Sequence, residues 1–159
     1  FWEAVGDNSK MAYVYLKATE GGTHIDPTYK KNIELAHRYG LKVGSYHFFR
    51  PKTDLEQQME NFKSQCRPGD QDLIPMIDIE TTGGLNTEEF CDSLFKFLKL
   101  VEKEYRQKPF KIFCNVRKER SRKDKFYQGC FCPAEFYPYR KTSTACADSV
   151  VQASGRKRK

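Results

Sequence analysis

The sequence has few of the features that place a protein in a membrane or a secretion pathway. No uninterrupted apolar run approaches the roughly 18 residues of a membrane-spanning helix, so none is expected. The chain does not start with methionine, and its first ten residues, FWEAVGDNSK, contain no cleavable signal pattern. We therefore expect a fragment or a processed product, from which export cannot be read.

The chain also has little that would bind a metal. It contains three histidines and six cysteines. The closest two cysteines, Cys130 and Cys132, lack the C-x-x-C spacing of common zinc sites and have no histidine nearby. At 159 residues the chain is too large to need a disulfide framework. We expect free thiols or incidental bridges, no metal site and no cofactor.

The first 113 residues lack an excess of either charge. The net charge of +7 comes from residues 114–159, mainly from RKERSRKDK (117–125) and GRKRK (155–159). A basic balance confined to one end says little about the partner of the main body. We expect this end to be solvated. Adhesion to anionic cell-wall polymers and contact with nucleic acid are the alternatives.

What the chain does contain is an alternation of strand-like and helix-like segments. Short runs rich in β-branched or aromatic residues predict strands at 12–17, 41–49, 74–80 and 110–114. Apolar residues at helical spacing predict helices at 26–40, 53–66 and 86–106. The alternation indicates one α/β domain with a parallel sheet and right-handed crossovers. A barrel and an open doubly wound sheet both fit it.

The third predicted strand, PMIDIE (75–80), ends with two carboxylates. Residues two apart on a strand share a face, so Asp78 and Glu80 should point the same way, opposite to Ile77 and Ile79. Neighbouring acids shift each other's proton affinity, which suits a reaction that needs one acid and one base. A pair of solvated or salt-bridged acids at a strand end is the alternative.

Four motifs occur in a fixed order along the first two-thirds of the chain. They are KATEG (17–21), the DP that opens a helix (26–27), GSYHF (44–48) and DIE (78–80). Together they resemble glycoside hydrolase family 25, the Chalaropsis-type muramidases, over about residues 1–114. The resemblance implies a (β/α) TIM-barrel-like parallel barrel. It also implies hydrolysis of the β-1,4 bond between N-acetylmuramic acid and N-acetylglucosamine in bacterial peptidoglycan.

The resemblance also implies roles for individual residues. Glu80 would be the general acid, and Asp78 would stay ionised and stabilise positive charge by orienting the substrate's own N-acetyl group. The residues expected to bind substrate at the ends of the first two strands are Tyr46, Phe48, Glu20, Lys17, His47 and Arg50. Each has a structural alternative. Lys17 and Glu20 can pair with each other, the aromatic rings can pack in the core, and His47 can be a hydrogen-bonded core histidine.

The sequence departs from the family at both ends. The family begins with a strand that carries an Asp of the catalytic centre, followed by a Trp-containing segment. FWEAV (1–5) resembles that later segment, so we expect a barrel incomplete at its N-terminus. Val151-Gln152 stands where the family has Trp-Gln. We expect a glycosidase barrel core over residues 1–114 and a divergent basic segment over residues 115–159.

These features predict a muramidase that acts as a monomer, outside the cell or at the cell wall, with bacterial peptidoglycan as its partner. The first alternative is a carbohydrate-binding protein that has kept the cleft and lost turnover with the first-strand Asp. The second is a nucleic-acid-binding module formed by the basic segment, and we rank it last.

Overall fold

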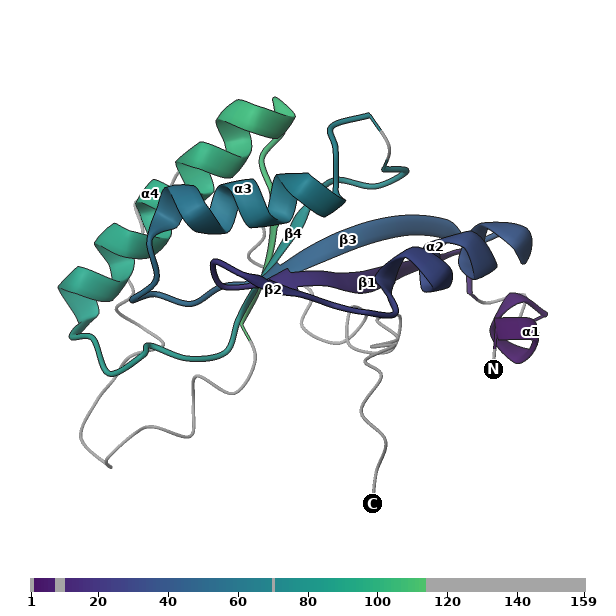
Figure 1. Ribbon diagram of the computed structural model, residues 1–159, viewed down its shortest axis with the longest axis horizontal. Coiled ribbons are helices and arrows are strands. Elements are labelled where there is room, and N and C mark those ends of the chain that lie inside the picture. The colour runs from purple at the N-terminus through teal and green to yellow at the C-terminus, as the bar shows by residue number, and fades with distance from the viewer. Residues whose placement is uncertain (1, 8–10, 70, 114–159) are drawn as a thin grey trace, which may run out of the picture.

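The computed structural model describes residues 2–7, 11–69 and 71–113. They form a five-stranded sheet with helices packed against it (Figure 1). The strands are β1 (Tyr13–Glu20), β2 (His24–Ile25), β3 (Lys42–Phe48), β4 (Met76–Ile79) and β5 (Phe110–Phe113). The helices are α1 (Trp2–Gly6), α2 (Tyr29–Arg38), α3 (Leu55–Gln65) and α4 (Thr87–Tyr105). The basic segment 115–159, and every expectation placed on it, lies outside the described residues.

The predicted strands and helices are confirmed. The four predicted strands correspond to β1, β3, β4 and β5, and they pair in parallel in that order. The three predicted helices correspond to α2, α3 and α4. Two short elements were not predicted. One is α1, and the other is β2, which pairs antiparallel with the end of β1 over two residues. Elements this short carry no readable periodicity.

The described sheet is open. Its strand order is β2-β1-β3-β4-β5, so β2 and β5 lie at its two edges within the described residues. The mixed α/β class is therefore established. The closed TIM-barrel-like arrangement expected from the family resemblance is not shown by these strands.

Helices α2, α3 and α4 cover one face of the sheet (Figure 1). Their predicted apolar stripes are buried there and pack on one set of strand side chains, namely Val14, Leu16, Ala18, Ile77 and Ile79. The opposite face carries a separate cluster of Tyr15, Tyr46 and Met76. Alternate residues of β4 thus go to opposite faces, as its sequence predicts, and Asp78 lies on the face away from the helices.

The two long helices begin at side-chain caps. Asp54 accepts a hydrogen bond from Gln57 N (2.8 Å) at the start of α3. In α4, Asn86 accepts from Glu89 N (3.0 Å), while Glu89 Oε2 accepts from Asn86 N (3.2 Å). This is a complete capping box.

A glycine in β3 lets the two central strands pack closely on the face away from the helices. A Cβ at Gly44 would lie 2.3 Å from Tyr15 Cε1, so the Tyr15 ring occupies the space that any other residue would fill. The Tyr15 hydroxyl donates to the Ile74 carbonyl oxygen at 3.0 Å. This arrangement ties β1 to the loop before β4.

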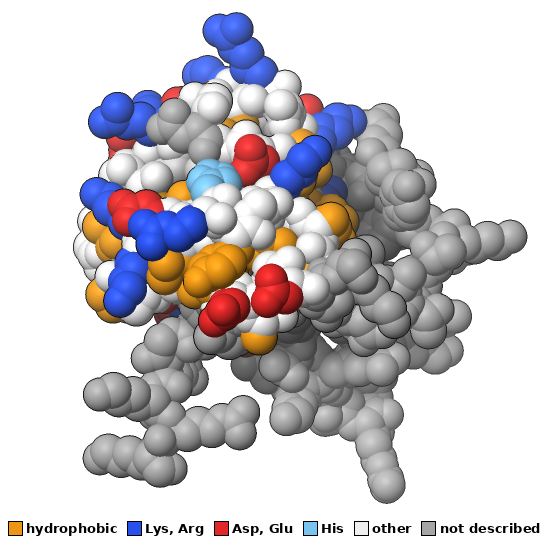
Figure 2. Space-filling view, turned by 90° about the vertical axis from the view of Figure 1, so that its right-hand side faces the viewer, with side chains coloured by type: hydrophobic (Ala, Val, Ile, Leu, Met, Phe, Trp, Pro, Cys, Tyr) orange, Lys and Arg blue, Asp and Glu red, His pale blue; other side chains and the backbone are white. Residues whose placement is uncertain are grey.

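The exposed surface of the described residues is mixed in charge. On the side shown in Figure 2, acidic and basic side chains are interspersed and separated by small hydrophobic patches. No helix among the described residues is both long and apolar enough to cross a membrane. Cys66 is a buried thiol outside any disulfide.

Candidate active site

The carboxyl groups of Asp78 and Glu80 meet at the carboxyl end of β4. Asp78 is 4% exposed, whereas Glu80 is only partly buried. The two side chains are close enough for Glu80 to raise the pKa of Asp78. Asp78 aligns with Phe48 of β3 on one side and with Ile112 of β5 on the other. The expected juxtaposition of the two acids is therefore present.

The chain turns away sharply after the two acids. The residues after Glu80 are Thr81, Thr82, Gly83 and Gly84, and both glycines have positive φ angles of 64° and 71°. Gly83 N donates to Thr81 Oγ1 at 3.0 Å, which closes a local turn. Glycine adopts these angles without steric cost, so the strand ends here and the pair remains at its tip.

The surroundings of the pair favour a proton on the deeper acid. In the structure, burial raises the pKa of Asp78 well above its usual range, and the charge and hydrogen bond of Glu80 raise it further. The charge of Lys17 and a backbone hydrogen bond oppose this increase without cancelling it. Asp78 takes up a proton more readily than expected because it is the deeper of the two acids.

Asp78 also has one oxygen without a partner. Within the described part of the chain, its Oδ1 is buried and accepts no hydrogen bond. An unsatisfied buried acceptor costs roughly 1–3 kcal/mol. Such a cost at the tip of a strand is typical of a site that meets its partner in a bound molecule.

Charged residues from the ends of β1 and β3 lie on the same face as Asp78. The pairing of β1 with β3 shifts between Lys17 and Thr19, which leaves Ala18 without a partner residue on β3. Residues three apart on a regular strand face opposite ways, but this extra residue places Lys17 and Glu20 on one face. Lys17 Nζ lies 2.6 Å from Glu20 Oε2.

Glu20 joins two cations over an aromatic ring. Its Oε1 accepts from Arg50 Nε at 2.9 Å and from the terminal guanidinium nitrogen of the same residue. Lys17 Nζ is 5.0 Å and Arg50 Cζ 4.6 Å from the centroid of the Phe48 ring. Burial raises the pKa of Glu20, but the hydrogen bonds and charges of Lys17 and Arg50 outweigh it and lower this pKa to about 2. Glu20 is therefore ionised at any ordinary pH.

Two aromatic candidates lie at different depths. Phe48 is partly exposed next to Asp78, whereas Tyr46 is 5% exposed and packs with Tyr15 and Met76 below it. Among the described residues, Tyr46 therefore forms the floor beneath the acids, and Phe48 offers the more accessible ring.

His47 must be removed from the expected substrate-binding residues. It is fully buried on the helix-covered face, with its ring 5.5 Å from that of Phe62 and 5.2 Å from that of Phe97. Its Nδ1 is 2.8 Å from Thr19 Oγ1, and its Nε2 is 3.2 Å from Gln58 Oε1. Burial lowers the pKa of His47 to about 4. His47 is therefore a hydrogen-bonded core histidine, the structural alternative given in the sequence analysis. Its position on β3 directs its side chain to the face opposite Asp78.

Two buried amides in α3 fix the loops that carry the site, and sequence reasoning missed both. Gln58 accepts from Arg50 N (3.0 Å) and donates to Arg50 O (3.0 Å). Asn61 donates to Gly21 O (2.9 Å) and His24 O (3.0 Å). The available signal was that both lie near the apolar stripe of α3, where a polar residue needs a buried partner.

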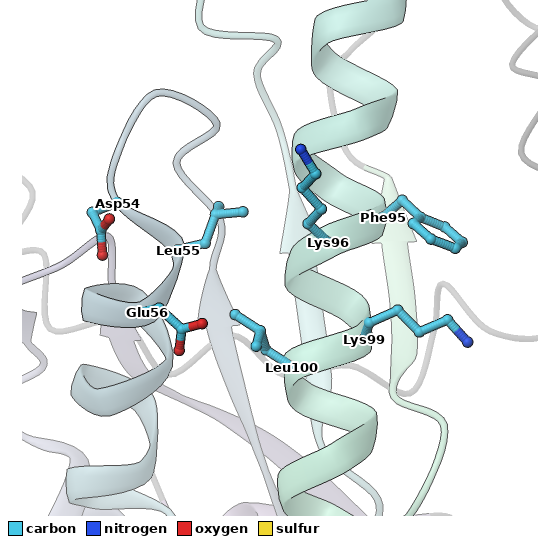
Figure 3. Close-up of a pocket in the computed structure, with 7 residues that line it drawn as sticks. All are labelled: Asp54, Leu55, Glu56, Phe95, Lys96, Lys99 and Leu100. Carbon is cyan, nitrogen blue, oxygen red and sulfur yellow. The ribbon is translucent and has the colours of Figure 1, made fainter.

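The described residues also form a groove of about 460 Å³ between α3 and α4 (Figure 3). Seven residues line it, namely Asp54, Leu55, Glu56, Phe95, Lys96, Lys99 and Leu100. The groove belongs to the helical layer, on the other side of the sheet from Asp78. We do not assign the hydrolytic chemistry to this groove, because Asp78 and Glu80 do not line it.

Comparison with known proteins identifies the class. The chain belongs to the glycosyl hydrolases of family 25, whose family model matches residues 2–128. A protein named YegX of Escherichia coli K12 is 31% identical over 112 residues, which are 68% of this chain and 41% of that protein. The autolytic lysozyme of Clostridium acetobutylicum is 36% identical over 89 residues, covering 56% of this chain and 27% of the lysozyme.

A solved structure agrees. The family 25 glycosyl hydrolase of Bacillus anthracis matches with a TM-score of 0.62 and 28% identity, over 70% of this chain and 54% of that one. The chain therefore spans about half of this structure, and less than half of the two sequence relatives.

Proposed function

We propose that this chain is a muramidase, which hydrolyses the β-1,4 bond between N-acetylmuramic acid and N-acetylglucosamine in bacterial peptidoglycan. The observation that carries the proposal is the contact between Asp78 and Glu80 at the carboxyl end of β4, in a chain of family 25. The names of relatives such as the autolytic lysozyme support the same reaction. We infer that the protein is located outside the cell or at the cell wall, and that it is a monomer.

In the proposed mechanism the pair holds one proton. Glu80, the more accessible acid, donates it to the glycosidic oxygen as the bond from that oxygen to the sugar C1 breaks. The proximity of the two carboxyl groups would give the proton a route from the deeper Asp78 to Glu80. Water then adds at C1, and the Glu80 carboxylate takes its proton, which restores the starting state.

We propose that Asp78 stabilises the positive charge that develops at C1. Its unpartnered Oδ1 is a suitable acceptor for the N–H of the substrate's acetamido group. That contact would orient the acetamido oxygen toward C1, as in substrate-assisted glycosidases. As the proton passes to Glu80, Asp78 gains the negative charge that this role needs.

We propose that substrate contacts come from the ends of β1 and β3. Phe48 offers a ring face for a sugar, while Arg50, Lys17 and Glu20 surround that ring with charge. Tyr46 supports this surface from below.

We also infer that the open sheet is part of a TIM-barrel-like sheet. Parallel strands are almost always covered on both faces, yet in the described residues helices cover only one. In a barrel the other face turns inward, and catalytic residues gather at the carboxyl ends of the strands, where Asp78 and Glu80 lie in this chain.

The test is the clearing of bacterial cell-wall suspensions by the full chain. We expect wild type to clear them and Glu80→Gln and Asp78→Asn to lose at least about 100-fold of the rate, the usual contribution of a general acid. Asp92→Asn is the matched control, because Asp92 is an exposed acid paired with Lys96 on α4. Equal clearing by wild type and Glu80→Gln would refute the assignment. Binding of cell walls without clearing would indicate a carbohydrate-binding protein instead.

A further inference from the structure

The Lys17 ammonium contacts the Glu20 carboxylate, and its charge also lowers the pKa of Asp78. Glu20, Phe48 and Asp78 form one row across β1, β3 and β4. Neighbouring strands lie about 4.8 Å apart, so Glu20 and Asp78 flank Phe48 at roughly equal distances. Lys17 starts lower on β1, level with Tyr46, but its Nζ reaches Glu20 at 2.6 Å and lies 5.0 Å from the centre of the Phe48 ring.

From this geometry we propose that Glu20 is a positioning residue. It holds the Lys17 ammonium over Phe48 and so prevents this ammonium from pairing with Asp78 alone. The Asp78–Glu80 pair therefore retains its proton. This inference rests on the muramidase function proposed above. It assigns Lys17 and Glu20 a role in the protonation of the acid pair, in addition to lining the site.

The position of Glu20 is fixed from three directions. The extra residue Ala18 turns its side chain onto the face of Asp78. Arg50 holds its second carboxylate oxygen, and Gln58 holds the backbone of Arg50 on both sides. Asn61 fixes the chain directly after it through Gly21 O. A surface ion pair would not need this support.

The charged groups around Asp78 can be named element by element. β1 contributes Lys17 and Glu20, the segment after β3 contributes Arg50, and the end of β4 contributes Glu80. The residue of β5 aligned with Asp78 is Ile112, which does not titrate. Lys17 lowers the pKa of Asp78 and Glu80 raises it. With Glu20 ionised and one proton on the acid pair, the two cations and two negative charges that the described residues place here balance.

The decisive experiment is an NMR titration of the Asp78 side-chain carboxyl carbon in the full chain, with its signal assigned by its loss in Asp78→Asn. We expect Lys17→Met to raise the pKa of Asp78 by about 1 pH unit, at the low end of the effect of a nearby opposite charge. We expect Glu20→Gln to lower it, because Lys17 then turns to Asp78. Lys96→Met, which removes an equivalent cation from α4, should leave it unchanged.

The opposite directions of the two pKa shifts separate this role from a structural one. A general loosening of the site would shift the pKa of Asp78 in the same direction in both variants. Shifts in one direction, or none in Glu20→Gln, would overturn the proposal. The alkaline limb of the clearing rate should move up in Lys17→Met and down in Glu20→Gln, and a limb that stays in place would also count against it. Absence of clearing in wild type would refute the muramidase function, whereas the titration would still decide the role of Glu20.

Discussion

Asp78 is costly for the fold. It is almost fully buried, one of its oxygens has no partner within the described residues, and its neighbour Glu80 carries the same charge. Each of these features opposes folding when the group is ionised. A residue selected only for stability at this position would be apolar, like Met76 on the same face. The arrangement is therefore best explained by the chemistry that we propose for the site.

Asp78→Asn should therefore stabilise the protein at neutral pH. A carboxyl whose pKa is raised on folding contributes most below its unfolded value, about 4, and this contribution is lost as the pH rises through the folded value. Asparagine keeps the shape and cannot ionise, so the variant should exceed wild type by about 1–3 kcal/mol at pH 8 and by less at pH 5. Urea unfolding at both pH values measures this. A variant no more stable than wild type at pH 8 would show that the buried acid carries no penalty.

At the scale of elements, the sequence predicts what depends on local pattern. Strand 74–80 and helix 86–106 were found because their apolar residues follow a period of two and of 3.6 along the chain. The register shift at Ala18 was not found, because it depends on how β1 aligns with β3. By strand alternation alone, Lys17 and Glu20 would lie on opposite faces of the sheet. The contacts of Gln58 and Asn61 were missed for the same reason, since their partners lie on other segments.

Gln58→Leu should cost far more than a typical substitution on a helix. Gln58 is fully buried and satisfies backbone groups of Arg50 and Thr53. Leucine fills the volume but leaves these groups unpaired, at roughly 1–3 kcal/mol for each. We expect a loss of about 3 kcal/mol or more in the free energy of unfolding, measured in urea. Gln57→Leu, at the exposed neighbouring position, is the control. If both variants lose the same amount, the buried amide is not what holds the loop.

At the scale of the whole molecule, two buried groups among the described residues, Asp78 and His47, oppose each other in their response to pH. The raised pKa of Asp78 makes the protein lose stability as the pH rises from about 4. The pKa of His47, lowered to about 4 by burial, has the opposite effect. Its contribution is complete above about 6.5, the ordinary histidine value, and is lost as the pH falls toward 4. Wild type should therefore change little in stability across this range.

His47→Gln should reveal the hidden pH dependence. Glutamine can replace part of the hydrogen bonding but does not titrate, so the variant loses only the histidine contribution. The stability difference between wild type and variant should shrink by about 2–3 kcal/mol between pH 7 and pH 4.5, from the size of the pKa shift. Urea midpoints at the two pH values test this, with His37→Gln as the exposed control. A constant difference would mean that His47 has the same pKa in the folded and the unfolded chain.

The order of the strands has a consequence for how the chain acquires its structure. Among the parallel strands, β3 lies beside β1, β4 beside β3 and β5 beside β4, which is also their order along the chain. Every pairing of two parallel strands therefore joins segments about 30 residues apart, so each strand can dock once the crossover that follows the previous strand has been made. During synthesis, β1, β3 and their helices can assemble before β4 leaves the ribosome. The cations and the aromatic ring would then be in place when the two acids arrive.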